Sequence, residues 1–347
     1  MILTKTPFRV SFFGGGTDYP EWFQENGGSV LATSITHYCY IQGRVLPPFF
    51  DYKYRLVWSK IEQVIELNDI EHPVIREALK LMNFNFGLEV HHHGDLPARS
   101  GLGSSSSFCV GMLHMMHVLN GKTPTKDQLT KDAIFLEQKI LKETVGVQDQ
   151  IITSHGGLNQ VEILPSGKYK LNPITLSKDK ASDFEDRILL FYTGVSRFAS
   201  DIAKKQVLAI PKNISNLQEM QKLVDIATDV LCNGNNLDDF GRLLNQTWQL
   251  KRGLESSITP NFVDDIYSKA IKAGALGGKL LGAGGGGFMI FYVTQERRSA
   301  VLNALNELLL VPFKIDHTGT KLMYSKGQNY SQISQNSAMN FLRKNVD

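Results

Sequence analysis

The chain has 347 residues, of which 42% are hydrophobic and 20% are charged, and this composition excludes a wholly disordered protein. Lys and Arg number 37 against 34 Asp and Glu; a formal charge of +3 without a basic block argues against a nucleic-acid partner. Three widely spaced cysteines and apolar runs far shorter than the ~20 residues of a membrane span predict a cytoplasmic protein with no membrane partner.

The first half of the chain is predicted to contain strands and two long helices. Alternating apolar residues predict a strand over 1–13, which a glycine-rich turn at 14–17 ends. β-branched and aromatic residues predict further strands over 30–41 and 86–91. An apolar helix with a serine cap is predicted over 104–119, and an amphipathic helix with a capping box over 125–142.

The second half of the chain has a different texture, rich in helical periodicity. A strand is predicted near its start, at 187–192. The remaining predicted elements are helices over 197–208, 214–233, 236–256 and 260–273, strands over 278–282 and 287–294, a helix over 296–309, and strands near 311–316 and 321–325. This order predicts an α+β fold with two lobes, residues 1–175 and 176–347, instead of repeated βαβ units.

A glycine- and serine-rich segment lies between a predicted strand and the predicted apolar helix. It reads Leu-Pro-Ala-Arg-Ser-Gly-Leu-Gly-Ser-Ser-Ser-Ser over residues 96–107. Gly101 and Gly103 would let the backbone approach an anion, and the free N–H groups of the helix start would bind it. Serine hydroxyls can also ligate Mg²⁺. A flexible turn with an ordinary serine cap explains the same residues, so this segment alone favours phosphate binding only modestly.

A second glycine cluster, over residues 282–287, matches the G-x-G-x-x-G pattern of dinucleotide-binding folds. That pattern must open a helix, whereas the apolar residues 288–293 that follow here are typical of a strand. The sequence also contains no G-x-x-x-x-G-K-[ST], which excludes a Walker P-loop. Neither common nucleotide-binding motif therefore accounts for the glycines.

Three segments together resemble the GHMP kinase superfamily, named for galactokinase, homoserine, mevalonate and phosphomevalonate kinases. They are Pro-Phe-Arg-Val-Ser-Phe-Phe-Gly-Gly-Gly-Thr-Asp-Tyr over 7–19, the glycine–serine segment over 97–107, and Lys-Leu-Leu-Gly-Ala-Gly-Gly-Gly-Gly over 279–287. Each segment is a weak signal alone, but the ordered triplet spans most of the chain and is specific. The resemblance implies a ribosomal-protein-S5-like N-terminal lobe and a ferredoxin-like C-terminal lobe, with an ATP site between them.

The resemblance also implies Mg²⁺-dependent transfer of a phosphoryl group from ATP to a hydroxyl. The residues that it assigns to the phosphates of ATP are Gly101, Leu102, Gly103, Ser104, Ser105 and Ser106. Those that it assigns to a C-terminal glycine loop are Gly282, Gly284 and Gly285. Ser105 and Glu137 match the residues that ligate the metal in the family.

The segment Gly-Val-Gln-Asp-Gln over 146–150 resembles the galactokinase segment that carries the catalytic aspartate. Asp149 is therefore the implied proton acceptor or electrostatic anchor for the attacking hydroxyl. Arg9 would lie beside Asp149 and steady the transferring charge. Without the three motifs, Asp149 would be read as a helix cap, Arg9 as a surface ion pair and Glu137 as a solvated helix carboxylate.

The sugar-binding residues depart from those of galactokinases. Galactokinases read Gly-Glu-His-Thr-Asp-Tyr where this chain has Gly-Gly-Gly-Thr-Asp-Tyr over 14–19. The resemblance assigns Thr17 and Asp18 to the sugar, whereas Gly15 and Gly16 lack the side chains that grip galactose. We expect the vacated space to admit a sugar with a longer tail.

The pattern over residues 12–20 is similar to that of the D-glycero-D-manno-heptose 7-phosphate kinases, which make the 1,7-bisphosphate for nucleotide-activated heptose. Arg197 is the candidate partner for the C7 phosphate, although a solvated helix position suits it equally. The expected ligands are ATP, Mg²⁺ and a sugar phosphate, bound by a monomer or homodimer. A fucokinase- or galactokinase-like enzyme is the alternative, as is a non-catalytic sugar and ATP sensor on the same fold.

Overall fold

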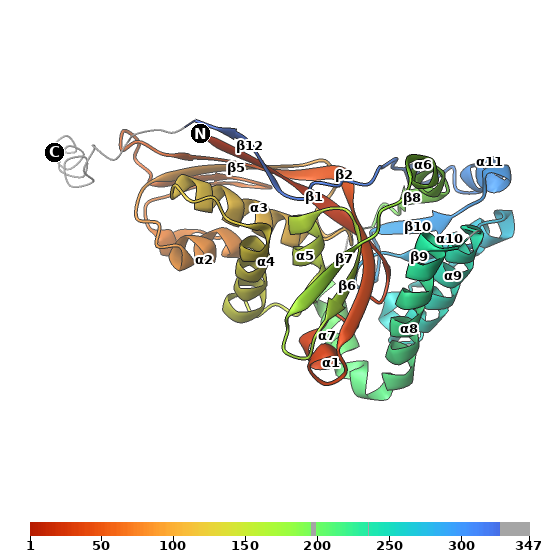
Figure 1. The fold of residues 1–347 in the computed structure, drawn as a ribbon. Coiled ribbons are helices and arrows are strands. Elements are labelled where there is room, and N and C mark those ends of the chain that lie inside the picture. The colour runs from red at the N-terminus through yellow and green to blue at the C-terminus, as the bar shows by residue number, and fades with distance from the viewer. Residues whose placement is uncertain (196–198, 235, 327–347) are drawn as a thin grey trace.

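The structure is a computed structural model that describes residues 1–195, 199–234 and 236–326, and its strands form two sheets (Figure 1). The first sheet consists of β1 (Ile2–Phe13), β2 (Gly28–Val45), β3 (Tyr54–Val57), β4 (Ile61–Val64), β5 (Leu88–Gly94), β6 (Leu158–Ile163), β7 (Tyr169–Pro173) and β12 (Lys321–Ser325). Its strand order is β12-β1-β2-β5-β3-β4, and β6 pairs with β2 and β7. The only parallel pair in this described sheet joins β3 to β5.

The strands β1 and β2 form the long antiparallel pair at the centre of the first sheet. The first part of β2 pairs with β6 and its last part with β5, while β1 runs beside nearly all of it. Every residue of β1 from Thr6 to Phe13 is buried, as expected of a strand covered on both faces. A charged residue on this stretch, such as Arg9, therefore points into the protein interior.

Helices gather on one face of the first sheet (Figure 1). They are α2 (Pro73–Leu81), α3 (Ser104–Leu119), α4 (Lys126–Ile134) and α5 (Gln148–His155); the short helix α1 (Pro20–Asn26) follows the turn after β1. Both α3 and α5 contact β1 and β2 directly. The π-helical turn Phe135–Ile140 continues α4, and a 3₁₀ turn, η1 (Leu67–Asp69), precedes α2.

The second sheet is antiparallel, with the order β11-β8-β10-β9. Its elements and the helices around it are α6 (Lys178–Asp186), β8 (Ile188–Tyr192), α7 (Ala199–Ala209), η3 (Ile210–Lys212), α8 (Ile214–Cys232), α9 (Asp238–Arg252), η4 (Ser256–Ile258), α10 (Asn261–Ala273), β9 (Gly277–Leu280), β10 (Phe288–Tyr292), α11 (Gln295–Ala304) and β11 (Leu309–Leu310). The helices α8 and α9 pack on each other and also reach β1. None of the helices in the described residues is both long and apolar enough to cross a membrane.

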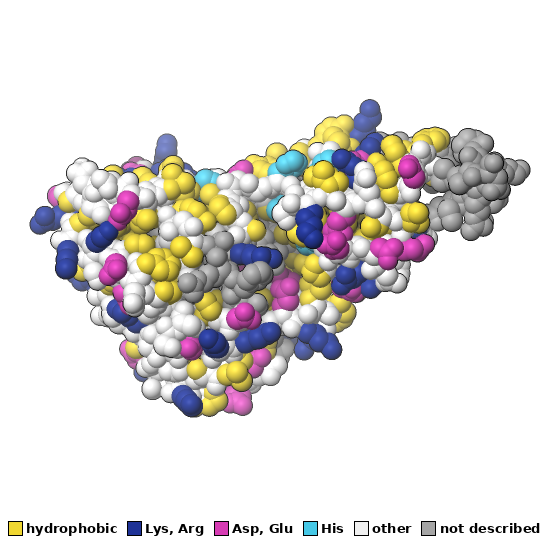
Figure 2. All heavy atoms as spheres, turned by 180° about the vertical axis from the view of Figure 1, so that it is seen from behind, with side chains coloured by type: hydrophobic (Ala, Val, Ile, Leu, Met, Phe, Trp, Pro, Cys, Tyr) yellow, Lys and Arg dark blue, Asp and Glu magenta, His cyan; other side chains and the backbone are white. Residues whose placement is uncertain are grey.

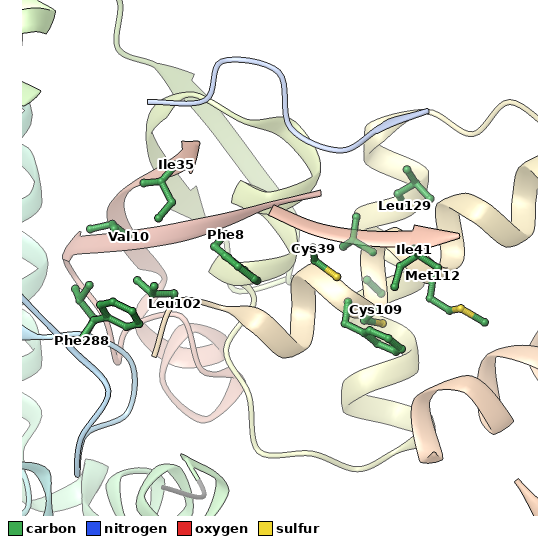
Figure 3. Packing of buried hydrophobic residues seen from close by; sticks show 14 of the residues in the cluster. Phe8, Val10, Ile35, Cys39, Ile41, Leu102, Cys109, Met112, Leu129 and Phe288 are labelled. Atoms are coloured by element: carbon green, nitrogen blue, oxygen red, sulfur yellow. The ribbon is translucent and has the colours of Figure 1, made fainter. Parts of the chain in front are cut away.

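One hydrophobic core runs through both sheets. Figure 3 shows Phe8 and Val10 of β1, Leu102 of the glycine–serine loop and Phe288 of β10 in the same group of buried side chains. Leu102 has no exposed surface, so it anchors that loop in the core. The core therefore fixes the relative positions of segments that are more than 180 residues apart in sequence.

The predicted α+β class is confirmed, whereas several predicted elements are wrong in detail. The helix predicted over 125–142 is α-helical only to Ile134. The helix predicted over 296–309 ends at Ala304, and the strand predicted near 311–316 is instead β11 at Leu309–Leu310. Pro312 explains the short strand, because proline has no N–H to donate to a neighbouring strand.

Candidate active site

Arg9 of β1 and Asp149 of α5 form a bidentate ion pair. The Nε of Arg9 donates to Oδ1 of Asp149 at 2.6 Å, and an Nη donates to Oδ2 at 2.7 Å. The other Nη of Arg9 donates to the carbonyl oxygen of Gly101 at 2.6 Å. The side chain of Arg9 is 5% exposed and that of Asp149 is 23% exposed, so the carboxylate is the accessible half of the pair.

The glycine–serine loop wraps against this pair with three residues in the left-handed region, Arg99 and two glycines. Gly101 has φ +84° and Gly103 has φ +69°. A Cβ at Gly103 would lie 2.9 Å from Cγ of Arg9 and 3.2 Å from Oδ2 of Asp149, so a side chain there would displace the pair. The loop leads directly into α3, whose first turn leaves backbone N–H groups free for an anion.

Glu137 lies beneath the start of α3, where two serine hydroxyls reach it. Its carboxylate accepts from Oγ of Ser105 at 3.3 Å, from Oγ of Ser106 at 3.0 Å and from the amide of Gln150 at 2.6 Å. Glu137 is fully buried, and burial raises the pKa of its carboxyl to about 8. Among the described residues no cation forms an ion pair with Glu137. The resemblance assigned Ser105 to the metal, but the hydroxyl of Ser106 lies closer to the Glu137 carboxylate.

This donor set fits a magnesium ion. Mg²⁺ prefers oxygen ligands and is commonly held by one or two carboxylates together with substrate phosphates. Ser105 and Glu137 supply a hydroxyl and a carboxylate next to the loop that would hold the phosphates. A buried carboxyl with a raised pKa is also the group that a bound cation would stabilise in its ionised form.

The π-helical turn explains why Glu137 points inward. An α-helix continued past Ile134 would place successive residues at 100° steps, whereas the wider turn over Phe135–Ile140 inserts extra backbone there. Phe135 is consequently 46% exposed, and Glu137 is buried. This turn could not be predicted, because the apolar spacing of the segment is compatible with an unbroken amphipathic helix.

Asp18 and Thr17 lie in the turn after β1 with different surroundings. Asp18 is buried, and its Oδ1 accepts from the backbone N–H of Gly16 at 3.0 Å. Burial, together with nearby Asp149, raises the pKa of the Asp18 carboxyl. The hydroxyl of Thr17 donates to the carbonyl oxygens of Gly14 and Ser29, each at 2.9 Å. Thr17 thus braces the turn from within, and its assignment to the sugar stays a prediction.

The two glycines that replace the galactokinase side chains have different surroundings. A Cβ at Gly15 would meet only Oγ of Ser11 at 3.6 Å and Nε2 of Gln148 at 3.8 Å. Gly16 has φ +113°, and a Cβ there would lie 3.2 Å from Leu217 of α8. A Cβ is therefore accommodated at Gly15 without a clash, whereas Gly16 lines a small pocket together with Tyr19 and Leu217.

Two polar side chains beside Gly15 were not anticipated from the sequence. Ser11 and Gln148 are 4% and 8% exposed, and Oγ of Ser11 and Oε1 of Gln148 have no hydrogen-bond partner in the described structure. Buried polar atoms are normally paired, so a ligand that reached these two atoms would supply their missing hydrogen bonds. The signal was present, because Ser11 shares a strand face with Arg9 and Gln148 directly precedes Asp149.

The C-terminal glycine loop packs on the glycine–serine loop through backbone atoms. A Cβ at Gly282 would lie 2.6 Å from Cα of Gly101. Gly284 and Gly285 face η4 instead, where the N–H of Gly285 donates to the carbonyl oxygen of Ile258 at 3.0 Å. Of the three predicted loop glycines, only Gly282 contacts Gly101, whose carbonyl oxygen accepts from Arg9 of the Arg9–Asp149 pair. Arg197, the candidate C7-phosphate partner, lies outside the described residues.

A helix start behind a glycine loop, a buried carboxylate with two hydroxyls and an Arg–Asp pair whose carboxylate is partly exposed form an arrangement suited to phosphoryl transfer. The family models agree: the GHMP kinases N terminal domain matches residues 72–157 and the GHMP kinases C terminal matches residues 215–309. Together the two matches cover more than half of the chain. The chain therefore belongs to the GHMP kinases, which are phosphotransferases that use ATP.

Individual relatives share most of the chain at low identity. D-glycero-alpha-D-manno-heptose 7-phosphate kinase of Campylobacter jejuni is 27% identical over 323 residues, covering 88% of this chain and 93% of that protein. Bifunctional fucokinase/GDP-fucose pyrophosphorylase of Arabidopsis thaliana is 24% identical over 86% of this chain but only 30% of that protein. The fold matches a D-glycero-D-manno-heptose 1-phosphate kinase from Bacteriodes thetaiotaomicron with a TM-score of 0.78 at 21% identity, covering 94% and 100% of the two chains.

Proposed function

We propose that this protein is an ATP-dependent sugar kinase that phosphorylates the C1 hydroxyl of D-glycero-D-manno-heptose 7-phosphate. The observation that carries the proposal is the absent side chain at Gly15, next to Oγ of Ser11 and Nε2 of Gln148, the residue that precedes Asp149 of the Arg9–Asp149 pair. Heptose 7-phosphate has a longer tail than galactose, and the missing side chain at Gly15 leaves more room for a larger sugar than galactokinases have there. The Campylobacter relative, which matches nearly the whole chain, supports the same substrate.

The reaction follows from the placement of the side chains. The N–H groups at the start of α3 and the loop from Gly101 to Ser106 would hold the phosphates of ATP. Ser105 and Glu137 would hold Mg²⁺, which supplies neutralisation of phosphate charge. Asp18 would bind ring hydroxyls of the sugar and orient C1.

Asp149 would receive the proton that the C1 hydroxyl loses as it attacks the γ-phosphorus. Both carboxylate oxygens of Asp149 accept from Arg9, yet each keeps a further lone pair, and the carboxylate is the exposed half of the pair. Arg9 fixes the carboxylate's orientation and adds positive charge beside the transferring phosphoryl group. The product would be the 1,7-bisphosphate, an intermediate for nucleotide-activated heptose and surface polysaccharide.

A fucokinase-like activity is the second candidate, and the Arabidopsis relative favours it. Fucose lacks a phosphate and a long tail, so it would leave the space at Gly15 partly empty. A sensor without catalysis is the third possibility. The assembled Asp149, Arg9, Ser105 and Glu137 weigh against a sensor, because a sensor needs neither a proton acceptor nor a metal ligand.

An ADP-release screen separates these candidates. Heptose 7-phosphate, mannose, fucose, galactose and homoserine are offered at equal concentration with ATP and Mg²⁺. We expect heptose 7-phosphate to give the highest kcat/KM, and Asp149→Asn to lose turnover by about 10³-fold or more while ATP still binds. A preference for fucose would replace the proposed substrate, and release of no ADP with any acceptor would favour the sensor.

A further inference from the structure

Two buried lysines lie at the same site without a carboxylate partner. Lys251, on α9, is 6% exposed, and its Nζ donates to the carbonyl oxygen of Gly282 at 2.6 Å. Lys279, on β9, is 2% exposed, and its Nζ donates to the carbonyl oxygens of Ser11 at 2.7 Å and Phe12 at 3.1 Å. Over the described ranges neither lysine lies within ion-pair distance of an acidic side chain.

The charges around these lysines do not balance. The charged groups that act on Lys251 are Arg9 of β1, Lys279 of β9, Asp18 of the turn after β1 and Asp149 of α5. Asp149 is engaged on both oxygens by Arg9, and burial raises the pKa of Asp18. A buried ammonium without a counter-charge is strongly unfavourable, so the cluster is short of an anion.

The pKa values of both lysines are lowered, as expected where no anion balances their charge. Burial and the neighbouring Arg9 lower the pKa of Lys251 to about 8. Burial also lowers the pKa of Lys279 well below its usual value. A phosphate placed beside Lys251 would oppose both effects and favour its charged form.

The donor geometry distinguishes the two lysines. An ammonium group has three donors, and Lys279 uses two of them on backbone carbonyls of β1. Lys251 uses one donor, on the carbonyl oxygen of Gly282, and Gly282 packs against Gly101 of the glycine–serine loop. The two free donors of Lys251 are therefore available where the two glycine loops meet.

We propose that Lys251 is an anion-binding residue of the active site that takes a phosphoryl group at the junction of the two glycine loops. This inference rests on the proposed kinase function. The group has two possible sources with the same chemistry, the γ-phosphate of ATP and a phosphate carried by the sugar. Lys279 lies near enough to act electrostatically on Lys251 and is held by the carbonyl oxygens of Ser11 and Phe12.

The test compares Lys251→Gln and Lys251→Arg with Lys269→Gln, a control that removes an exposed lysine paired with Glu307. The first measurement needs no turnover: the melting temperature is followed as inorganic phosphate or pyrophosphate is added. We expect both anions to stabilise the wild type and Lys269→Gln but not Lys251→Gln. The stabilisation of the wild type should weaken as pH rises through about 8, whereas Lys251→Arg should retain it, because arginine stays charged.

Kinetics with heptose 7-phosphate and with an unphosphorylated sugar identify the source of the phosphate. If the sugar supplies it, Lys251→Gln should raise KM by about 10–100-fold for the phosphorylated sugar alone. If ATP supplies it, kcat should fall to a similar extent with both acceptors. Unchanged anion stabilisation in Lys251→Gln, with kcat and both KM values within about twofold of the control, would overturn the proposal. The melting experiment uses no sugar, so its result can be interpreted even if the proposed kinase function is wrong. If Lys251→Gln does not fold, the comparison of Lys251→Arg with the wild type above pH 8 still tests the proposal.

Discussion

Glu137 illustrates how burial changes one residue of this site. The pKa of its carboxyl is raised to about 8 from an ordinary value of 4.5. Between those two pH values the metal-free folded protein holds a proton that the unfolded chain has released. Stability therefore falls as pH rises across that window, and a bound cation would relieve the loss by stabilising the ionised carboxylate.

Replacing Glu137 by Gln should separate these two effects. In EDTA, Glu137→Gln should match the wild type near pH 5 and exceed its unfolding free energy by about 2–4 kcal/mol above pH 8, because the amide carries no charge to bury. Adding Mg²⁺ with a nucleotide should stabilise only the wild type, and the variant should lose ADP release. Urea unfolding at several pH values measures this, with the exposed Glu219→Gln as the control. A stability difference that does not vary with pH would contradict the account.

Sequence reasoning at this scale identified the charged residues of the site but not their neighbours. Arg9, Asp149, Glu137 and Ser105 were named from the family resemblance, and the structure brings them together in two contacting pairs. Ser106 was placed only on the phosphates, although it makes the shorter contact with Glu137. Lys251 was missed, because a lysine inside a long amphipathic helix is ordinarily a solvated residue.

At the scale of elements, the segment from α4 to α5 carries two of the proposed site carboxylates, Glu137 and Asp149. Thr125 caps α4 by accepting from the N–H of Gln128 at 3.1 Å, as the capping box predicted. The start of α5 is held against the turn after β1, where the N–H of Val147 donates to the carbonyl oxygen of Asp18 at 3.1 Å. Gly146 lies against the carboxylate of Asp18, so these contacts fix Asp149 relative to Asp18.

The substitution Gly146→Ala tests this junction. The added Cβ would lie 1.8 Å from Oδ2 of Asp18, so either α5 or Asp18 must move. We expect a loss of about 1–3 kcal/mol in stability and a fall in kcat/KM of about 100-fold, because small misplacements of reacting groups are costly. Gly253→Ala is a matched control, since its Cβ comes no closer than 3.4 Å to a neighbouring atom. Equal kinetics for the two variants would show that the junction does not position the site.

Elements with strong periodicity were predicted and short or irregular ones were not. The apolar helix predicted over 104–119 coincides with α3, because a continuous apolar run marks it; the predicted serine cap is wrong, since the N-cap is Gly103 and no side chain caps the helix. The eight-residue α5 carries no comparable pattern, and its main sequence signal was the resemblance around Asp149. The strands β6 and β7 were also missed, because they are short and partly exposed.

At the scale of the whole molecule, the site depends on contacts between distant parts of the chain. The glycine loops at Gly101 and Gly282 touch through backbone atoms, and α8 and α9 reach β1 from the second sheet. We retain a boundary near residue 175 as a proposal, noting that β12 returns from the end of the described chain to pair with β1. Figure 2 shows basic and acidic side chains interspersed over the face it displays, so this face carries no large patch of a single charge.

A substitution at Gly282 tests the contact between the two glycine loops. Gly282→Ala would place its Cβ 2.6 Å from Cα of Gly101, at a φ of +72°. Gly194→Ala is the matched control, because its φ is +76° but nothing lies within 4 Å of the added Cβ. Both variants carry a similar backbone strain, so the extra loss of stability in Gly282→Ala, about 1–3 kcal/mol, reports the loop contact. Thermal unfolding measures it, and ADP release should fall only in Gly282→Ala; identical behaviour of the two would contradict the contact's importance.

We infer that Asp149 and Arg9 assist transfer of the γ-phosphoryl group of ATP to the anomeric hydroxyl of a heptose phosphate, with ADP as the leaving group. Phosphorus NMR of the product formed from ATP and D-glycero-D-manno-heptose 7-phosphate tests it most directly, with Asp149→Asn as the blank. The account predicts a second sugar-phosphate resonance coupled to the anomeric proton, formed by the wild type and absent from the blank. A phosphate on any other hydroxyl, no bisphosphate at all, or equal product from Asp149→Asn would contradict it.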